Sequence, residues 1–213
     1  MIQIAIILGS TRPGRRAEAV ARWVTEVAGR HPAVKAGQAS IELVDLADYG
    51  LPLLDEPLPA ASGSYQNPHT KRWAATIDRF DGFVFVTSEY NGSMPAALKN
   101  AIDYLYAEWN HKAAGFVSHG VNGGIRAVAQ LRQIMGDIKI ADVNPQVALL
   151  TYTDFDLTGF DATDITTYAG VCAPGEHHET ALNTMLDEVL TRSHALRALR
   201  GPTVSADPRP GPT

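Results

Sequence analysis

The sequence contains almost no cysteine and no long hydrophobic run. Cys172 is the only cysteine among the 213 residues, so the chain cannot form an internal disulfide, which fits a reducing compartment such as the cytoplasm. The apolar segment from Met1 to Leu8 is too short to span a membrane and lacks the basic residues of a signal peptide. The formal net charge of −5 argues against general nucleic-acid binding. We therefore expect a cytoplasmic protein that binds neither membranes nor nucleic acids.

The common nucleotide-binding fingerprints are missing too. The chain has no Gly-x-x-x-x-Gly-Lys-Ser/Thr motif and no Gly-x-Gly-x-x-Gly after its first apolar run, which excludes a P-loop and a Rossmann dinucleotide site. The turn at residues 9–16 has neither the carboxylates of a phospho-acceptor site nor the cysteine of a cysteine phosphatase. If that turn binds a phosphate, it must therefore do so with groups other than those of these known sites.

What the sequence does contain is an alternation of short apolar runs and amphipathic stretches, which predicts an α/β protein. A length of 213 residues with 45% hydrophobic residues suits one domain with an ample core. The expected strands are residues 2–8, 40–46, 83–87, 113–118 and 140–150. Asn144-Pro145 suggests a bend or an edge position in the last of them. Four prolines in residues 201–213 predict a disordered tail, which leaves residues 1–200 as the domain.

The polar turn from Ser88 to Ser93 is the feature around which the chain is organised. It follows the apolar run 83–87 and precedes a helical pattern that begins near Pro95. It therefore lies at the carboxyl end of a strand, the edge at which open α/β sheets bind ligands. A turn that holds a carboxylate, a phenol, an amide and a glycine is well equipped to frame a flat heterocycle.

A second polar turn, residues 9–16, joins the first strand to a helix. Its sequence is Gly-Ser-Thr-Arg-Pro-Gly-Arg-Arg. A strand, a short turn and a helix N-terminus together present free N–H groups and the positive end of a helix dipole, which favour an anion. The hydroxyls of Ser10 and Thr11 and the three arginines indicate a phosphate monoester. The alternative is an ordinary capped helix with solvated arginines.

A third turn, His119-Gly120-Val121-Asn122-Gly123-Gly124, follows the strand at 113–118. Its glycines let the backbone lie against a planar ring, and the N–H groups at the start of the next helix can stabilise negative charge on that ring. His119 is either a substrate contact or, as we expect, a solvated loop histidine.

The central turn also carries a family resemblance. Glu89-Tyr90-Asn91-Gly92-Ser93, with Pro95 and then Leu98-Lys99-Asn100-Ala101-Ile102-Asp103, closely resembles the signature of the NAD(P)H-dependent FMN reductases. This flavodoxin-like family includes chromate, quinone and azo-dye reductases. The usual signature begins Pro-Glu-Tyr-Asn, and Ser88 stands here in place of the proline. The resemblance covers roughly residues 1–150 and the last helix. It implies a three-layer flavodoxin-like fold with a five-stranded parallel sheet in the order 2-1-3-4-5, in which the three turns converge on one crevice.

The resemblance also implies a cofactor, a reaction and site residues. FMN would accept a hydride from NADPH or NADH and then pass two electrons to a small-molecule acceptor: free flavin, a quinone, an azo compound or a metal oxyanion. No protein residue is expected to act as a catalytic acid or nucleophile. The cofactor contacts that we predict fall into three groups, one for each turn: Ser10, Arg12, Arg16 and Ala17 at the phosphate; Glu89, Tyr90 and Asn91 at the ring; Ser118, Gly120 and Gly123 at its pyrimidine edge. Ser88, at the start of the central turn, is a further predicted contact with the cofactor. Arg15 either binds the 2′-phosphate of NADPH or is solvated.

Two connecting segments have open interpretations. The proline-rich loop at 47–66 is either a lid beside the site, as the resemblance implies, or a stiff connector. Residues 151–175 depart from the family pattern and either overhang the flavin or form a solvated surface loop. The segment begins like a calcium loop, but Ile165 occupies the place of the bidentate glutamate, so we reject calcium. Glu176 to Glu179 cannot all face one metal ion from a helix.

Assembly and the class of function also have alternatives. By resemblance we expect a homodimer or a dimer of dimers, with Tyr104, Tyr106 and Trp109 either in the dimer face or in the core. A flavodoxin-type electron carrier, without its own NAD(P)H oxidation, is the main rival to the reductase. A flavin-free binding protein that kept the fold is the third possibility.

Overall fold

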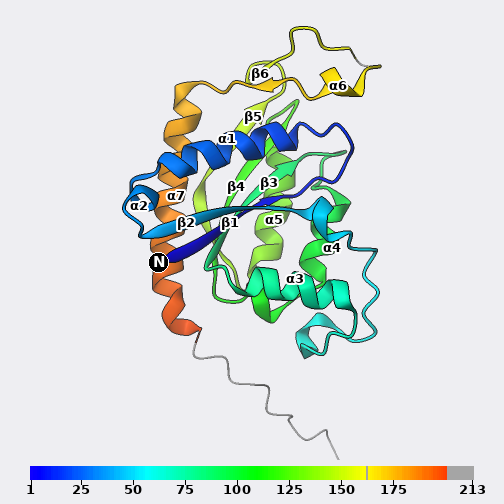
Figure 1. Ribbon diagram of the computed structural model, residues 1–213, viewed down its shortest axis with the longest axis vertical. Helices are drawn as coiled ribbons and strands as arrows, with labels where there is room; N and C mark the ends of the chain where they lie inside the picture. The colour runs from blue at the N-terminus through cyan, green and yellow to red at the C-terminus, as the bar shows by residue number, and fades with distance from the viewer. Residues whose placement is uncertain (162, 201–213) are drawn as a thin grey trace, which may run out of the picture.

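The computed structural model describes residues 1–161 and 163–200, and the predicted disordered tail at 201–213 lies outside them. A five-stranded sheet has the order β2-β1-β3-β4-β5, with every neighbouring pair parallel. The strands are β1 (Ile2–Leu8), β2 (Ala39–Asp45), β3 (Gly82–Ser88), β4 (Ala113–Gly120) and β5 (Ala141–Leu150). This is the flavodoxin-like order that we predicted, and all five carboxyl ends lie at one edge (Figure 1).

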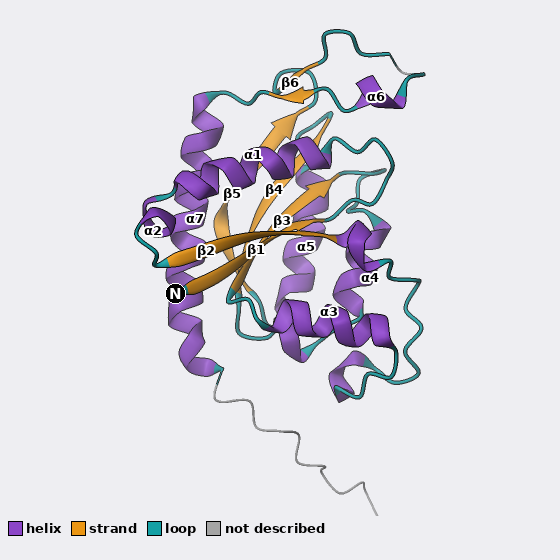
Figure 2. Ribbon diagram, in the orientation of Figure 1, coloured by secondary structure: helices purple, strands orange, loops and turns teal. Residues whose placement is uncertain are grey.

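Helices cover both faces of the sheet (Figure 2). On one face lie α1 (Ala17–Arg30) and α7 (Glu176–Leu196); on the other lie α3 (Pro68–Asp78), α4 (Ala96–Asp103) and α5 (Ile125–Asp137). Strand β1 explains why both faces are apolar. Ile4, Ile6 and Leu8 point to the core under α1 and α7, while Ala5 and Ile7 point to the opposite core.

The core on the α3 side is rich in aromatic rings. Trp73 donates from Nε1 to the carbonyl of Ala101 at 2.8 Å, and Trp109 donates to that of Ile102 at 3.1 Å. Trp73, Trp109 and Tyr104 are fully buried, and these two hydrogen bonds give each buried indole N–H a partner inside the core. Of the two interpretations open for Tyr104 and Trp109, the structure supports the core.

The β5 edge carries the expected irregularity. The register of β4 against β5 shifts between Ala114 and Phe116, opposite the Asn144-Pro145 segment, and β5 is an edge strand. Beyond it, β6 (Phe155–Asp156) and β7 (Val171–Cys172) form a small antiparallel pair with α6 (Ile165–Tyr168) between them. Short α2 (Pro32–Lys35) follows α1. No helix within the described ranges is both long and apolar enough to cross a bilayer.

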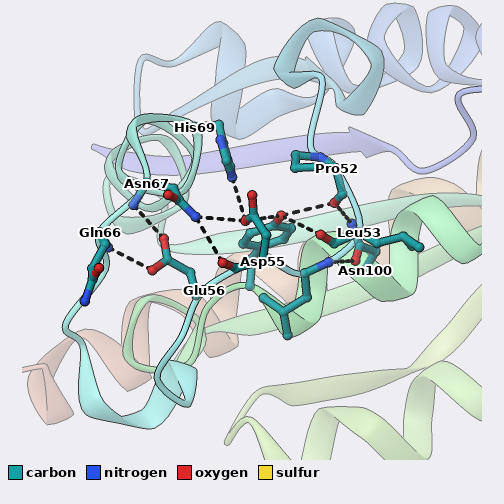
Figure 3. A network of polar contacts seen from close by, with 10 residues as sticks. Pro52, Leu53, Asp55, Glu56, Gln66, Asn67, His69 and Asn100 are labelled. Atoms are coloured by element: carbon teal, nitrogen blue, oxygen red, sulfur yellow. Dashed lines mark hydrogen bonds and ion pairs between the residues drawn. The ribbon is translucent and has the colours of Figure 1, made fainter.

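The proline-rich loop between β2 and α3 is fastened to α4 by hydrogen bonds (Figure 3). Asn100 donates to the carbonyl of Pro52 at 2.7 Å and accepts from the N–H of Leu54 at 3.0 Å. The carboxylate of Asp55 accepts from Tyr104 at 3.0 Å and lies 2.9 Å from Nε2 of His69, and the His69 contact lowers the pKa of Asp55. The segment is thus fastened as a stiff connector would be, and a role as a lid beside the site stays a prediction.

Candidate functional site

The three polar turns meet at the carboxyl edge of the sheet around a cleft of about 340 Å³. Six of the predicted residues line it, together with three that we had not assigned: Arg12, Arg16, Ser88, Glu89, Tyr90 and Gly120, with His119, Val121 and Thr151. The remaining predicted residues do not line the cleft. Ser10, Asn91 and Gly123 belong to the three turns, Ala17 begins α1 and Ser118 lies in β4, and of these Asn91 is exposed. The convergence expected from the strand order is therefore present.

The turn after β1 is joined to the central turn by a hydroxyl pair. Ser10, which is fully buried, has its Oγ 2.8 Å from the phenol oxygen of Tyr90. Just before Ser10, Gly9 lies close to β3, where a Cβ would lie 3.0 Å from the carbonyl oxygen of Val86. The two turns thus form one wall, held across β1 and β3.

Arg15 is not solvated, which was one of the two roles that we considered for it; binding of the 2′-phosphate of NADPH stays a prediction. Its guanidinium donates to the carbonyl of Ser10 at 2.7 Å and pairs with Asp45 at the end of β2. Its side chain is largely buried, so it is not solvated, and its donors hold the first turn. The pairing was invisible in the local sequence because the carboxylate comes from a strand 30 residues away.

The first turn ends at the N-terminus of α1, which has no side-chain cap. Arg16 occupies the N-cap position and Ala17 begins the helix, buried against the sheet. First-turn N–H groups without a capping side chain keep the positive end of the helix dipole available to an anion. The ordinary capped helix, our alternative for this turn, is therefore not what the structure has.

The central turn is a tight two-residue loop. Tyr90 and Ser93 exchange backbone hydrogen bonds of 2.8 and 3.0 Å, and the residues between them, Asn91 and Gly92, have φ values of 52° and 82°. Left-handed conformations at both central positions suit asparagine followed by glycine. From α5, Gln130 donates to the carbonyl of Gly92 at 3.2 Å, which braces the loop from behind.

Glu89 is bound to the start of α5. Its carboxylate, only 7% exposed, accepts from Nε of Arg126 at 2.7 Å and from the backbone N–H of the same residue at 3.1 Å. Its own N–H donates to the carbonyl of His119 at 3.2 Å, so the central and third turns are joined here. Since Arg126 neutralises Glu89, Arg12 and Arg16 make the cleft electropositive.

The third turn is shaped by glycines with positive φ. Gly123 and Gly124 have φ values of 72° and 71°, and a Cβ on Gly124 would lie 2.9 Å from the carbonyl oxygen of His119. The hydroxyl of Ser118 is buried and donates to the carbonyl of Gly123 at 2.6 Å. In this structure Ser118 thus holds the turn, and its contact with a flavin stays a prediction.

His119 is not the solvated loop residue that we expected. It lies in β4, is 6% exposed and has Nε2 at 2.9 Å from Oγ of Ser88. Burial, and then the nearby charges of Arg16 and Arg12, lower its pKa to about 4. The imidazole is therefore neutral at physiological pH. Its burial was hidden from us because β4 extends two residues further than the apolar pattern indicated.

The segment after β5 lies over the first turn (Figure 1). Arg16 donates to the carbonyl of Ala169 at 3.2 Å, and its guanidinium lies 6.0 Å from the ring centre of Phe155 and 5.6 Å from that of Phe160. Gly14 faces Ile165 so closely that a Cβ would lie 2.5 Å from its side chain. The segment is therefore packed against the first turn, and whether it also overhangs a flavin stays a prediction.

Comparison with known proteins agrees with this geometry. Residues 2–154 match the family described as NADPH-dependent FMN reductase. The NAD(P)H-dependent FMN reductase ntnL of Nectria sp is 40% identical over 156 residues, 71% of this chain and 76% of that protein. The NAD(P)H-dependent FMN reductase C4B3.06c of Schizosaccharomyces pombe is 42% identical over 151 residues, 70% of this chain and 72% of that protein. A quinone reductase of Escherichia coli K12 is 37% identical over 141 residues, 63% of this chain and 69% of that protein.

Solved structures share the fold. FerB, a flavoenzyme NAD(P)H:(acceptor) oxidoreductase from Paracoccus denitrificans, superposes with a TM-score of 0.64 at 20% identity, covering 92% of this chain and 98% of its own. A flavodoxin from the domain Archaea superposes with a TM-score of 0.54 at 10% identity, covering 91% of this chain and 99% of its own. At these identities the likeness supports the three-layer architecture alone.

Proposed function

Since the chain belongs to the NADPH-dependent FMN reductase family, we propose that it oxidises NADPH or NADH through FMN and reduces a quinone in a two-electron step. It is an oxidoreductase with FMN as cofactor and a reduced nicotinamide as co-substrate. The observation that supports the proposal is the shared cleft, in which a turn suited to a phosphate and a turn suited to a flat ring open onto the same space.

The groups around the cleft fit FMN. Arg12, Arg16 and the uncapped start of α1 supply positive charge and donors for a phosphate, which we expect to be completed by Ser10 and the backbone of Ala17. The residues expected to hold the ring are Glu89, Tyr90 and Asn91 along one side and Ser118, Gly120 and Gly123 at its pyrimidine edge. Ser88, which precedes the central turn, is the remaining predicted cofactor contact. These assignments remain predictions for each residue.

Bound FMN would supply the hydride and electron transfer, so the chain needs no nucleophile of its own. Its residues bind and orient. The Ser10–Tyr90 pair joins the two turns that form one wall of the cleft. We expect the N–H groups of the third turn to favour negative charge at the ring edge. Arg126, by neutralising Glu89, keeps a carboxylate from opposing that charge.

A quinone is the acceptor that the mouth of the cleft fits best. Val121 is 60% exposed and Tyr90 is 37% exposed, and both line the opening. An apolar side chain and an aromatic ring at the entrance suit a flat, uncharged molecule more than a small anion. Curated relatives at 37% identity include quinone reductases, which supports the same class.

Assembly and location complete the proposal. The fastened loop before α3 presents Leu53, which is 84% exposed, and Leu54 beside α4, and such apolar side chains suit an interface between two copies of the chain. We propose a homodimer, or a dimer of dimers, in the cytoplasm. Light scattering of the purified protein should give a mass of two or four chains, and a monomer at micromolar concentration would exclude this assembly.

Anaerobic stopped-flow spectroscopy tests the reaction. The FMN-loaded protein should lose its flavin absorbance when mixed with NADPH or NADH and regain it on addition of a benzoquinone, with parallel-line ping-pong kinetics at steady state. If flavin bound but was not reduced by either nicotinamide, the protein would be a flavodoxin-type carrier instead. If apoprotein failed to quench FMN fluorescence at all, the proposal for the cleft would be wrong.

A further inference from the structure

Ser88 and His119 form a polar pair at the floor of the cleft. They are partners in the register of β3 against β4, and Oγ of Ser88 lies 2.9 Å from Nε2 of His119. Both line the cleft and both are almost fully buried. Val86 and Val117, two residues earlier in each strand, pack in the core under α1, so the pair points to the same face of the sheet as the N-terminus of α1.

The charges around this pair indicate what it faces. Arg12 and Arg16 line the same cleft and are close enough to His119 to disfavour its protonation. From the segment after β5, the apolar ring of Phe155 lies against the imidazole, with ring centres 6.0 Å apart. Glu89, the neighbouring carboxylate, is neutralised by Arg126. The pair therefore lies beside two cations, with no unpaired carboxylate among the residues that line the cleft.

A neutral imidazole in this position can set the direction of the serine hydroxyl. If Nε2 carries the proton, it donates to Oγ of Ser88, and the hydroxyl proton of Ser88 must then point to another acceptor. The cleft beside Arg12 and Arg16 is where such an acceptor would lie. An anion held by the two arginines would receive this proton in a charge-assisted hydrogen bond.

We propose that Ser88, oriented by His119, donates a hydrogen bond to the phosphate of the flavin, and that the pair makes the site select FMN over riboflavin. The inference rests on the proposed function of the cleft and adds a specificity-determining residue and a positioning residue to it. Proline, the usual residue at this place in the resembled signature, has no hydroxyl and could not make this contact.

Flavin binding to the apoprotein tests the pair without any turnover. Titrations of FMN and of riboflavin, followed by quenching of flavin fluorescence, give two dissociation constants for each variant. Ser88→Ala should weaken FMN binding about tenfold, as expected for a lost hydrogen bond to a charged group, and change riboflavin binding less than about twofold. Ser88→Thr keeps the hydroxyl and should restore most of the FMN affinity.

Ser193→Ala is the matched control. Ser193 is a buried serine on α7 that packs against Gly82, at the opposite end of β3, and its hydroxyl has no hydrogen-bond partner within the described residues. This variant should bind both flavins like the unaltered protein. Thermal unfolding of each variant separates a folding defect from a binding defect.

A double-mutant cycle tests the positioning role of His119. His119→Phe alone should weaken FMN binding about threefold to tenfold, but in the Ser88→Ala background it should have no further FMN-specific effect, because it acts through the serine. Additive losses would show that His119 contacts the phosphate itself and would overturn the positioning role.

The other outcomes separate the two proposals. Equal losses for FMN and riboflavin in Ser88→Ala would make the pair purely structural, overturning this inference while the reductase proposal stands. If the unaltered protein bound neither flavin, the proposed function would fail first and this inference with it. Competition by inorganic phosphate should weaken in Ser88→Ala, and unchanged competition would also contradict a phosphate contact.

Discussion

The two edges of the sheet use charged residues in opposite ways. At the amino edge, the buried carboxylate of Asp81 accepts from the N–H of Gln3 at 2.8 Å and from Arg197 and Arg200 at 2.5 to 3.0 Å. Every one of these donors is directed at the same acceptor. At the carboxyl edge, Arg12 and Arg16 line a cleft together with Glu89. The carboxylate of Glu89 is paired with Arg126, which does not line the cleft. One edge is thus an ion-pair network around a single buried carboxylate, and the other presents two arginines to a cleft.

Comparing the two edges shows that the volume of a cavity does not identify the binding site. The cavity at the amino edge is the larger of the two, about 700 Å³, and its lining includes Asp81, Lys112 and Arg200. Lys112 is buried and donates to the carbonyls of Ile77 and Asp78 at 2.8 and 2.9 Å, so it closes the end of α3. Nε of Arg200 has no hydrogen-bond partner within the described residues, but Asp81 and Lys112 are already bound to other protein groups, which leaves less for a ligand than the size of the cavity suggests.

Removing the central acceptor of the amino edge should have the largest effect on stability. Asp81→Asn leaves Arg197 and Arg200 without their carboxylate. The carboxylate is buried but Arg197 is 44% exposed, so we expect a cost of about 3 kcal/mol, the low end for breaking a buried pair. Urea unfolding should show this loss, while the dissociation constant of FMN should change less than about twofold because the cleft is at the other edge. A parallel loss of FMN affinity would mean that the two edges are coupled.

The two edges should also respond to pH in different ranges. The folded state lowers the pKa of His119 to about 4 from an ordinary value of 6.5, so between these values the unfolded chain binds a proton that the folded chain does not. Stability should therefore fall as pH drops from 6.5 to 4, by about 3 kcal/mol from this group. Urea titrations of the apoprotein at several pH values should show a shallower dependence in His119→Phe.

Lys112 gives the corresponding effect at alkaline pH. Burial lowers its pKa to about 8 from 10.5, so the unfolded chain binds the additional proton between pH 8 and 10.5, and stability from this group should rise with pH there. Lys112→Met should flatten the dependence in the alkaline range and leave the acidic range unchanged. If either substitution altered the other range, the separation of the two edges would be contradicted.

The smallest effect that we predict concerns the clamp behind the central turn. Arg126→Gln leaves the carboxylate of Glu89 beside the cleft without its cation, and we expect a loss of about 1 kcal/mol in stability and a several-fold weaker binding of FMN. Lys99→Ala, which removes an exposed pair with Asp103 on α4, is the control and should change neither quantity measurably. Isothermal titration with FMN gives the comparison, and equal effects in the two variants would contradict the clamp.

Much of the fold followed from local patterns in the sequence. The apolar runs at 2–8 and 83–87 were long enough and sufficiently bounded by polar turns to identify β1 and β3, and the resemblance then supplied the strand order. The three turns could be placed at one edge because parallel strands end together. These steps need only the chain direction and the period of the hydrophobic pattern.

The partners of individual side chains could not be predicted in the same way. Arg15 pairs with Asp45 and Glu89 with Arg126, across 30 and 37 residues, and nothing in either local segment identifies the other. His119 was misassigned because a histidine next to a glycine-rich turn looks solvated until the neighbouring strand is known to bring Ser88 against it. Contacts of this kind depend on register and on side-chain direction, which the hydrophobic pattern leaves open.

The two-residue loop at Asn91-Gly92 has a thermodynamic consequence. With backbone hydrogen bonds on both sides, left-handed residues at its tip and Gln130 behind it, the loop has little conformational entropy left to lose. A guest molecule would meet a rim that is already rigid, and little of its binding energy would be consumed in ordering the protein. Ligands of similar size would then be discriminated by their shape, since the rigid loop cannot change its conformation to accommodate them.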